Sequence, residues 1–166
     1  MPKYQPPAVV YCDGGVIGPN PSAIGGTWAW CWVDSYGNRY RHAGGVVTPL
    51  RLGVEKVTNN VTELLAAVRL LLSLPDDWHG TLWTDSQVTL YRLTRPEAGM
   101  TGVPERLAEL LREVLKGKSM NVVLCGGHPT KEELRGGFRK RNGLPVSRHN
   151  VFCDHLCNRA AANFKL

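Results

Sequence analysis

The hydrophobic pattern changes its period about a third of the way along the chain, and this change restricts the possible folds more than any other feature. Up to residue 47 the apolar stretches are short and separated by glycine, proline and asparagine, which is typical of β-strands joined by turns. After residue 58, longer helical patterns alternate with short apolar strands. The pattern predicts strands at 8–12, 27–33, 39–47, 81–83 and 121–125, a hairpin at 34–38, and helices at 63–74, 87–93, 104–115 and 150–164.

Three antiparallel strands followed by alternating helices and strands indicate an α/β fold, a mixed sheet with helices packed on it. A chain of 166 residues is long enough for one domain with a substantial core but short for two. We therefore predict a single domain over 1–166. It begins with a short tail, 1–7, and carries a long polar loop at 129–148.

Composition narrows the class of partner. Lysine and arginine number 20 against 14 acidic residues, so the formal net charge is +6, which favours a polyanionic partner. No apolar run is long enough for a signal peptide or a membrane span. The five cysteines lie in or beside apolar stretches, as small core residues do. We expect a cytoplasmic protein with no membrane contact.

Two acidic residues fall inside the apolar pattern of predicted helices. On a helical wheel, Glu63 lies in the apolar arc between the directions of Leu70 and Ala67, where a lone carboxylate carries a large desolvation cost. Asp154 lies at the boundary of the apolar face of the last helix. Both positions favour a carboxylate at the rim of the core with a partner or a metal ion.

Two further acidic residues, Asp13 and Asp85, directly follow apolar strands, where a side chain can point into an open crevice. Four carboxylates at core edges predict a site for Mg²⁺, because two such ions can activate a water and stabilise the leaving oxygen in phosphodiester cleavage. Each residue also has a simpler interpretation: Asp13 as part of a turn, Asp85 as a helix cap, Glu63 as a charge near a helix N-terminus, Asp154 as a surface charge. The spacing does not show that the four meet.

Four motifs, in order along nearly the whole chain, resemble those of the type 1 ribonucleases H. They are Tyr-Cys-Asp-Gly-Gly at 11–15, Thr-Asn-Asn-Val-Thr-Glu-Leu-Leu-Ala-Ala at 58–67, Thr-Asp-Ser-Gln at 84–87, and Asn150-x-x-Cys153-Asp154-x-Leu156 followed by Ala160-Ala161. Each motif alone is weakly specific. The resemblance implies a ribonuclease H-like fold, with a central five-stranded mixed sheet of three antiparallel and two parallel strands and helices on both faces.

The resemblance also implies an activity and a site. The activity is endonucleolytic hydrolysis of the RNA strand of RNA–DNA hybrids, giving 5′-phosphate and 3′-hydroxyl ends. Two Mg²⁺ ions, with Mn²⁺ as an alternative, are expected on Asp13, Glu63, Asp85 and Asp154. Asn59, Asn60 and Gln87 match positions that contact the hybrid, and amides can both donate to and accept from a 2′-hydroxyl. Gly14 and Gly15 would allow close approach of the strand.

The family also carries a histidine after the last strand that assists proton transfer or product release. Gly126-Gly127-His128 occupies that place, which makes His128 the candidate. His149 is the rival, because it lies closer to Asp154 in sequence. A third interpretation, in which His128 only ends the loop, stays open.

The chain departs from the family in two places. The basic protrusion of many bacterial members is absent, since 94–103 is short and weakly charged, whereas the loop at 129–148 is longer than usual. This basic insertion is glycine-containing, and we predict that it is flexible and binds substrate phosphates beside the active site. Deleting 131–146 should then raise KM for the hybrid and weaken its salt dependence. The basic side chains proposed to contact substrate are Arg139, Lys140 and Arg141.

Two other functions stay open because folds host many activities. One is a related DNA nuclease or resolvase, and the other is a hybrid-binding module without catalysis. The first predicts cleavage of duplex DNA and the second predicts binding without cleavage. We expect no obligatory protein partner and a monomer.

Overall fold

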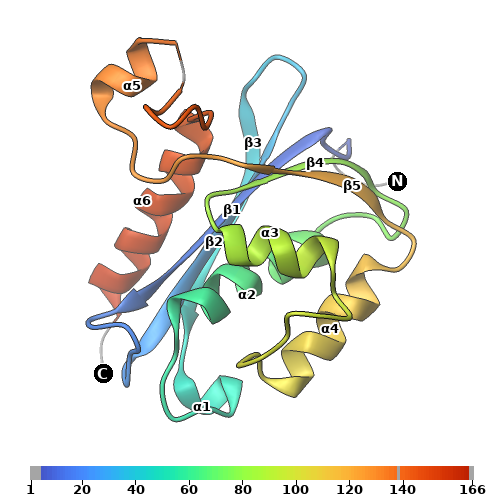
Figure 1. The fold of residues 1–166 in the computed structure, drawn as a ribbon, viewed down its shortest axis with the longest axis vertical. Coiled ribbons are helices and arrows are strands. Elements are labelled where there is room, and N and C mark those ends of the chain that lie inside the picture. The colour runs from blue at the N-terminus through green and yellow to red at the C-terminus, as the bar shows by residue number, and fades with distance from the viewer. Residues whose placement is uncertain (1–4, 138, 165–166) are drawn as a thin grey trace.

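The computed structural model describes residues 5–137 and 139–164, and within these ranges five strands form one mixed sheet (Figure 1). The strands are β1 (Val9–Ile17), β2 (Gly25–Val33), β3 (Arg39–Val47), β4 (His79–Thr84) and β5 (Ser119–Leu124). Their spatial order is β3-β2-β1-β4-β5, with β1 to β3 antiparallel and β4 and β5 parallel to β1. The predicted five-stranded mixed sheet is confirmed. Of the predicted tail 1–7, residues 1–4 lie outside the described part.

Strand β1 is longer than the sequence predicted. The predicted strand ended at residue 12, whereas β1 continues to Ile17, with Asp13 opposite Ala29 of β2. The glycines that suggested a turn take part in the ladder, with Gly14 opposite Trp28. Glycine is unusual inside a strand and often marks a close approach of another backbone. Here that backbone belongs to α2, because a Cβ built on Gly14 would lie 2.5 Å from the carbonyl carbon of Thr62.

Helices cover both faces of the sheet. The remaining elements are α1 (Pro49–Leu52), α2 (Asn59–Leu72), α3 (Gln87–Thr94), α4 (Glu105–Leu115), α5 (Lys131–Arg135) and α6 (Arg148–Asn163). In Figure 1, α2, α3 and α4 lie on one side of the sheet and α6 on the other. The larger core lies on the α2 side and joins the leucines of α2 to Trp30, Trp32 and Leu82. The smaller core, under α6, contains Cys31, Cys153 and Cys157.

Helix α2 begins four residues before the predicted start, at Asn59. The Thr58 side chain accepts a hydrogen bond from the amide of Val61 and so caps the helix. Glu63 consequently lies in the second turn, on a helix whose buried face rests on β1 and β2. The apolar pattern missed the first turn because three of its four residues are polar, although Val61 and Thr62 in that turn are buried.

The segment 129–148 contains more secondary structure than the loop that the sequence predicted, and its flexibility stays a prediction. It contains the short helix α5, which begins with a capping box between Thr130 and Glu133. An isolated bridge joins Arg139 to Pro145, and Phe138 lies outside the described residues. The capping signature was present in the sequence, but a five-residue helix is too short to give a periodic apolar pattern. The short helix α1 was missed for the same reason.

Candidate active site

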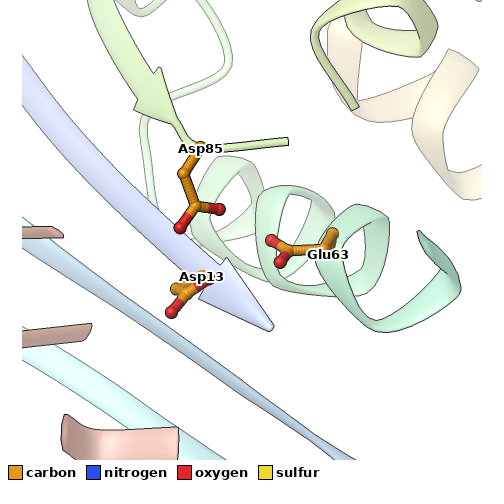
Figure 2. Close-up of side chains that lie close together, drawn as sticks. All are labelled: Asp13, Glu63 and Asp85. Carbon is orange, nitrogen blue, oxygen red and sulfur yellow. The ribbon is translucent and has the colours of Figure 1, made fainter. Parts of the chain in front are cut away.

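Three carboxylates converge at the centre of the sheet. Asp13 comes from β1, Glu63 from α2, and Asp85 from the residue that follows β4. One oxygen from each lies within 4.8 Å of the others, and Figure 2 shows the three groups pointing toward a common space. Asp13 and Glu63 are only 3% and 5% exposed, and Asp85 is half-buried. Three residues that are far apart in the sequence therefore form one cluster.

Burial and mutual repulsion both raise the pKa values of these three carboxyl groups. Burial raises the pKa of Asp13 well above its usual range, and the charges of Asp85 and Asp154 raise it further. The pKa of Glu63 is raised well above its usual range by burial and by the charges of Asp13 and Asp85. Burial also raises the pKa of Asp85. A divalent cation would remove this repulsion, so the chemistry of the donor set fits a hard cation.

Close packing of β1 on α2 brings Asp13 beside Glu63. The amide of Gly14 donates to Oε2 of Glu63 at 3.1 Å. Because Gly14 has no side chain, the strand and helix backbones approach within van der Waals distance at this point. The position of Glu63 in the cluster therefore depends on the glycine that follows Asp13.

Asn150 is a site residue to which the sequence analysis gave no role, although it stands in the last motif. It lies in the first turn of α6, is 1% exposed, and its Nδ2 donates to Oδ2 of Asp85 at 3.4 Å. This contact lowers the pKa of Asp85 against the stronger effect of burial. The signal that would have found it is its place one turn before Asp154, on the same side of the helix.

Asp154 and His128 lie together at the rim. Nδ1 of His128 is 3.8 Å from Oδ2 of Asp154, and the two side chains are 83% and 29% exposed. Asp154 lines the same cleft as the other three carboxylates, but it lies outside their tight group. His128 has a φ of +47°, a left-handed backbone conformation that residues other than glycine rarely adopt.

His149, the rival histidine, lies elsewhere. It is 7% exposed, and Arg39 lies with Nη1 2.8 Å from its Nδ1, where an arginine can only donate. Burial, followed by the positive charges of Arg39 and Arg148, lowers the pKa of His149 to about 4. A neutral, buried histidine that is bonded to an arginine of β3 is poorly placed to exchange protons at the cleft. The structure therefore favours His128 for that role.

The cleft has a volume of about 490 Å³. It is lined by every glycine, asparagine and glutamine that the sequence analysis expected to contact the substrate. Its lining residues are Asp13, Gly14, Gly15, Asn59, Asn60, Glu63, Asp85, Ser86, Gln87, Val88, Gly127, His128, Asp154 and Asn158.

The basic residues of the insertion do not line this cleft. Nη1 of Arg139 donates to the carbonyl of Gly143 at 2.8 Å, and Nζ of Lys140 donates to the carbonyl of Gly127 at 2.9 Å. Arg141 is exposed. Arg139 thus binds within the insertion and Lys140 binds the segment that leads to His128, and a role for the three residues in substrate binding stays a prediction.

The sheet order and the helices on both faces have counterparts among solved structures. A ribonuclease H1 from the archaeon Halobacterium salinarum superposes with a TM-score of 0.60 over 94% of this chain and 98% of that one, at 22% identity. This chain has the ribonuclease H fold. The N-terminal ribonuclease H domain of a Mycobacterium tuberculosis protein gives a TM-score of 0.58 at 15% identity, and covers 95% of each chain.

Similarity in sequence points to the same kind of protein as the fold does. A ribonuclease HI of Streptomyces coelicolor is 30% identical over an alignment that covers 81% of this chain and 58% of that protein. The chain therefore spans less than two thirds of the length of the curated relative that it matches. No protein-family model matches. The resemblance to type 1 ribonucleases H, predicted from the four motifs, is confirmed in sequence and in fold.

No helix in the described part of the chain has the length and apolar character needed to cross a membrane.

Proposed function

We propose that this chain is an endoribonuclease that hydrolyses the RNA strand of RNA–DNA hybrids. The observation that carries the proposal is the cluster of Asp13, Glu63 and Asp85 inside a cleft that amide side chains also line. Carboxylates at a core edge serve metal-assisted phosphodiester chemistry, and amides serve recognition of a polar sugar. Neither group of residues alone points to this activity, whereas their presence in one cleft on the ribonuclease H fold supports it.

Divalent cations, proposed as two Mg²⁺ ions with Mn²⁺ as an alternative, would be held by Asp13, Glu63, Asp85 and Asp154. When bound, such ions supply an activated water and charge stabilisation for the leaving oxygen. The chain's own part is to hold four carboxylates in place at a low dielectric. Asn150 supports this part, since it donates to Asp85 from a fully buried position. We propose products with 5′-phosphate and 3′-hydroxyl ends.

Substrate recognition is assigned to the amides at the cleft wall. Asn59 and Asn60 begin α2, Gln87 begins α3, and all three line the cleft. Amides can donate to and accept from a 2′-hydroxyl, which distinguishes RNA from DNA. Gly14 and Gly15 also line the cleft, and we propose that the nucleic acid backbone passes close to them. A ribonuclease H1 isolated from compost, similar to this chain with a TM-score of 0.55 at 16% identity, has been solved in complex with an RNA/DNA hybrid.

His128 is proposed to carry protons at the rim of the cleft. Its side chain is exposed and lies beside Asp154, so it can exchange protons with solvent and reach groups that enter the cleft. We also propose that the protein acts as a monomer.

The decisive experiment compares four conditions on labelled substrates. An RNA–DNA hybrid, duplex DNA and duplex RNA of one sequence are incubated with the protein in Mg²⁺, and the hybrid is also incubated in EDTA. We expect cleavage of the RNA strand of the hybrid alone, lost in EDTA and in Asp85→Asn. Cleavage of duplex DNA would instead support a resolvase-like nuclease. Binding of the hybrid without cleavage would support a non-catalytic module.

A further inference from the structure

The segment that carries His128 is held from behind by the basic insertion. Residues 126–128 leave β5 and pass over Asp85, and residues 139–145 form a turn that packs on their far side. The amide of Gly126 donates to the carbonyl of Pro145 at 2.8 Å. Within this turn, the amide of Lys140 donates to the carbonyl of Leu144 at 2.7 Å. The insertion is therefore attached to the strand end that leads to the histidine.

Lys140 makes the most specific of these contacts. Its Nζ donates to the carbonyl of Gly127 at 2.9 Å and lies 3.8 Å from Oε1 of Glu133. Glu133 is itself fixed by the capping box of α5, because its carboxylate accepts from the amide of Thr130 at 2.9 Å. The ammonium thus joins α5 to the peptide that precedes His128. A hydrogen bond with a charged donor is about twice as strong as a neutral one.

Two consecutive glycines make room for this arrangement, each for a different neighbour. A Cβ on Gly126 would lie 2.1 Å from Cδ of Lys140, so the lysine stem lies directly on that backbone. A Cβ on Gly127 would lie 2.9 Å from Oδ2 of Asp85. The Gly126–Gly127 backbone is thus packed between the lysine stem on one side and the Asp85 carboxylate on the other. Lys140 and Asp85 therefore pack against adjacent residues of one short segment.

The backbone at His128 requires such support. A left-handed φ on a residue other than glycine costs energy and persists only where the surroundings impose it. His128 cannot supply this support itself, because its side chain is 83% exposed. The hydrogen bond from Lys140 instead holds the carbonyl of Gly127, which belongs to the peptide that precedes His128.

From these contacts we infer that Lys140 is a positioning residue. It holds the Gly127–His128 peptide against Asp85 and keeps the imidazole beside Asp154. This inference rests on the proposed function, in which His128 assists at the cleft. It gives the insertion a different task from the phosphate binding that its charge suggests, since the ammonium of Lys140 points to the chain's own carbonyl.

The test uses Lys140→Met, which keeps the stem and removes the charge. The matched control is Lys131→Met, which removes a charge from an exposed lysine of the same insertion. On an RNA–DNA hybrid, Lys140→Met should lower kcat about tenfold with KM within about twofold. Lys131→Met should leave both unchanged, and Lys140→Arg should recover part of the loss, because a guanidinium still donates.

A double-mutant cycle separates positioning from a general structural effect. If Lys140 acts through His128, Lys140→Met should cause no further loss in a His128→Ala background. An additive loss would overturn the inference. A rise in KM with a weaker salt dependence would also overturn it, because that pattern belongs to a phosphate contact.

A second readout needs no substrate. Backbone amide hydrogen exchange at 126–128 should be about tenfold faster in Lys140→Met than in wild type or Lys131→Met, because the segment opens more often. Unchanged exchange would overturn the inference even if the activity fell. Because this measurement does not depend on catalysis, it also decides on the role of Lys140 if the protein proves not to cleave hybrids.

Discussion

The two walls of the cleft are built in different ways. One wall carries Asp13, Glu63 and Asp85 on or directly after β1, α2 and β4, beside the larger core. The other carries His128 and Asp154, the first on a loop and the second on a half-exposed face of α6. Packing of regular elements fixes the first wall, whereas in the second wall the loop that carries His128 is held by a few hydrogen bonds. The first wall thus suits groups that must stay in place, and the second suits groups that exchange protons with solvent.

Asp13→Asn should have the largest effect on activity. Removing one carboxylate from the buried cluster should lower hydrolysis of the hybrid by roughly a thousandfold. In EDTA, however, the same substitution should make the folded protein more stable. Because the pKa of Asp13 is raised in the folded state, its ionised form opposes folding at neutral pH, and the isosteric amide should raise the free energy of unfolding.

Activity assays and chemical denaturation, each in Mg²⁺ and in EDTA, check both parts of this prediction. Added Mg²⁺ should stabilise the wild type more than Asp13→Asn, because ligand binding to the folded state adds to stability. A variant that is less stable than wild type in EDTA would contradict the view that charge repulsion dominates this wall.

Two glycine substitutions compare the walls directly. In Gly14→Ala the new Cβ would meet the backbone of α2 at 2.5 Å, and neither element can move freely. We expect a loss of about 3 kcal/mol in the free energy of unfolding, together with loss of activity. In Gly127→Ala the Cβ would meet only the carboxylate of Asp85 at 2.9 Å. There we expect less than about 1 kcal/mol of destabilisation, but about a tenfold fall in kcat.

Urea denaturation and steady-state kinetics on the two glycine variants measure both quantities. Equal destabilisation by the two alanines would show that the walls are equally rigid. That result would contradict the view that close packing fixes only the first wall. Gly37→Ala is not a suitable control, because its positive φ of 81° would add strain of its own.

His128→Ala should have a smaller effect that is confined to activity. General acid–base assistance contributes about 10²-fold or more when it is complete, so we expect a fall in kcat of about 10- to 100-fold. The free energy of unfolding should change by less than about 0.5 kcal/mol, because the side chain is 83% exposed. His155→Ala, an exposed position on α6, is the control in kinetics and thermal unfolding. A kcat equal to that of wild type would mean that His128 only ends the loop and takes no part in catalysis.

The smallest expected effect on activity concerns His149, which affects stability and not catalysis. Its pKa is lowered to about 4 in the folded state, so the unfolded state takes up a proton first as the pH falls. The stabilisation present above about pH 6.5 should therefore be lost between about pH 6.5 and pH 4. His149→Gln should remove about 1 to 3 kcal/mol of that loss.

Urea denaturation at several pH values, with His155→Gln as the exposed control, isolates this contribution. Parallel curves for wild type and His149→Gln over this pH range would contradict a neutral, buried histidine at this position.

Much of the fold was predictable because local patterns and tertiary structure agree. The change of period near residue 50 predicted the mixed sheet, and β3 has the predicted bounds. Errors occurred where tertiary contacts override local signals. The predicted strand ended at residue 12, before Gly14 and Gly15, yet these glycines continue β1, because neighbouring β2 completes the ladder and α2 requires the space.

By itself the sequence determined which residues are candidates for the chemistry. Glu63 was conspicuous because a carboxylate inside an apolar arc is costly, and such a signal depends only on helical spacing. Asp13, Asp85 and Asp154 were candidates because they lie at the ends of apolar strands or at the boundary of an apolar helix face, and the motifs gave the amides by resemblance. Only the tertiary structure decided how they are grouped, with three carboxylates together and Asp154 at the rim.

Only the tertiary structure decided, too, which residues support the site. The tertiary structure directed His128 to the cleft and His149 to Arg39, added Asn150, and turned Lys140 inward to Gly127. The physical reason is that hydrophobic periodicity reports how deeply a residue is buried along its own element. The partner of a polar group depends on how elements distant in sequence pack together, and no local pattern records that.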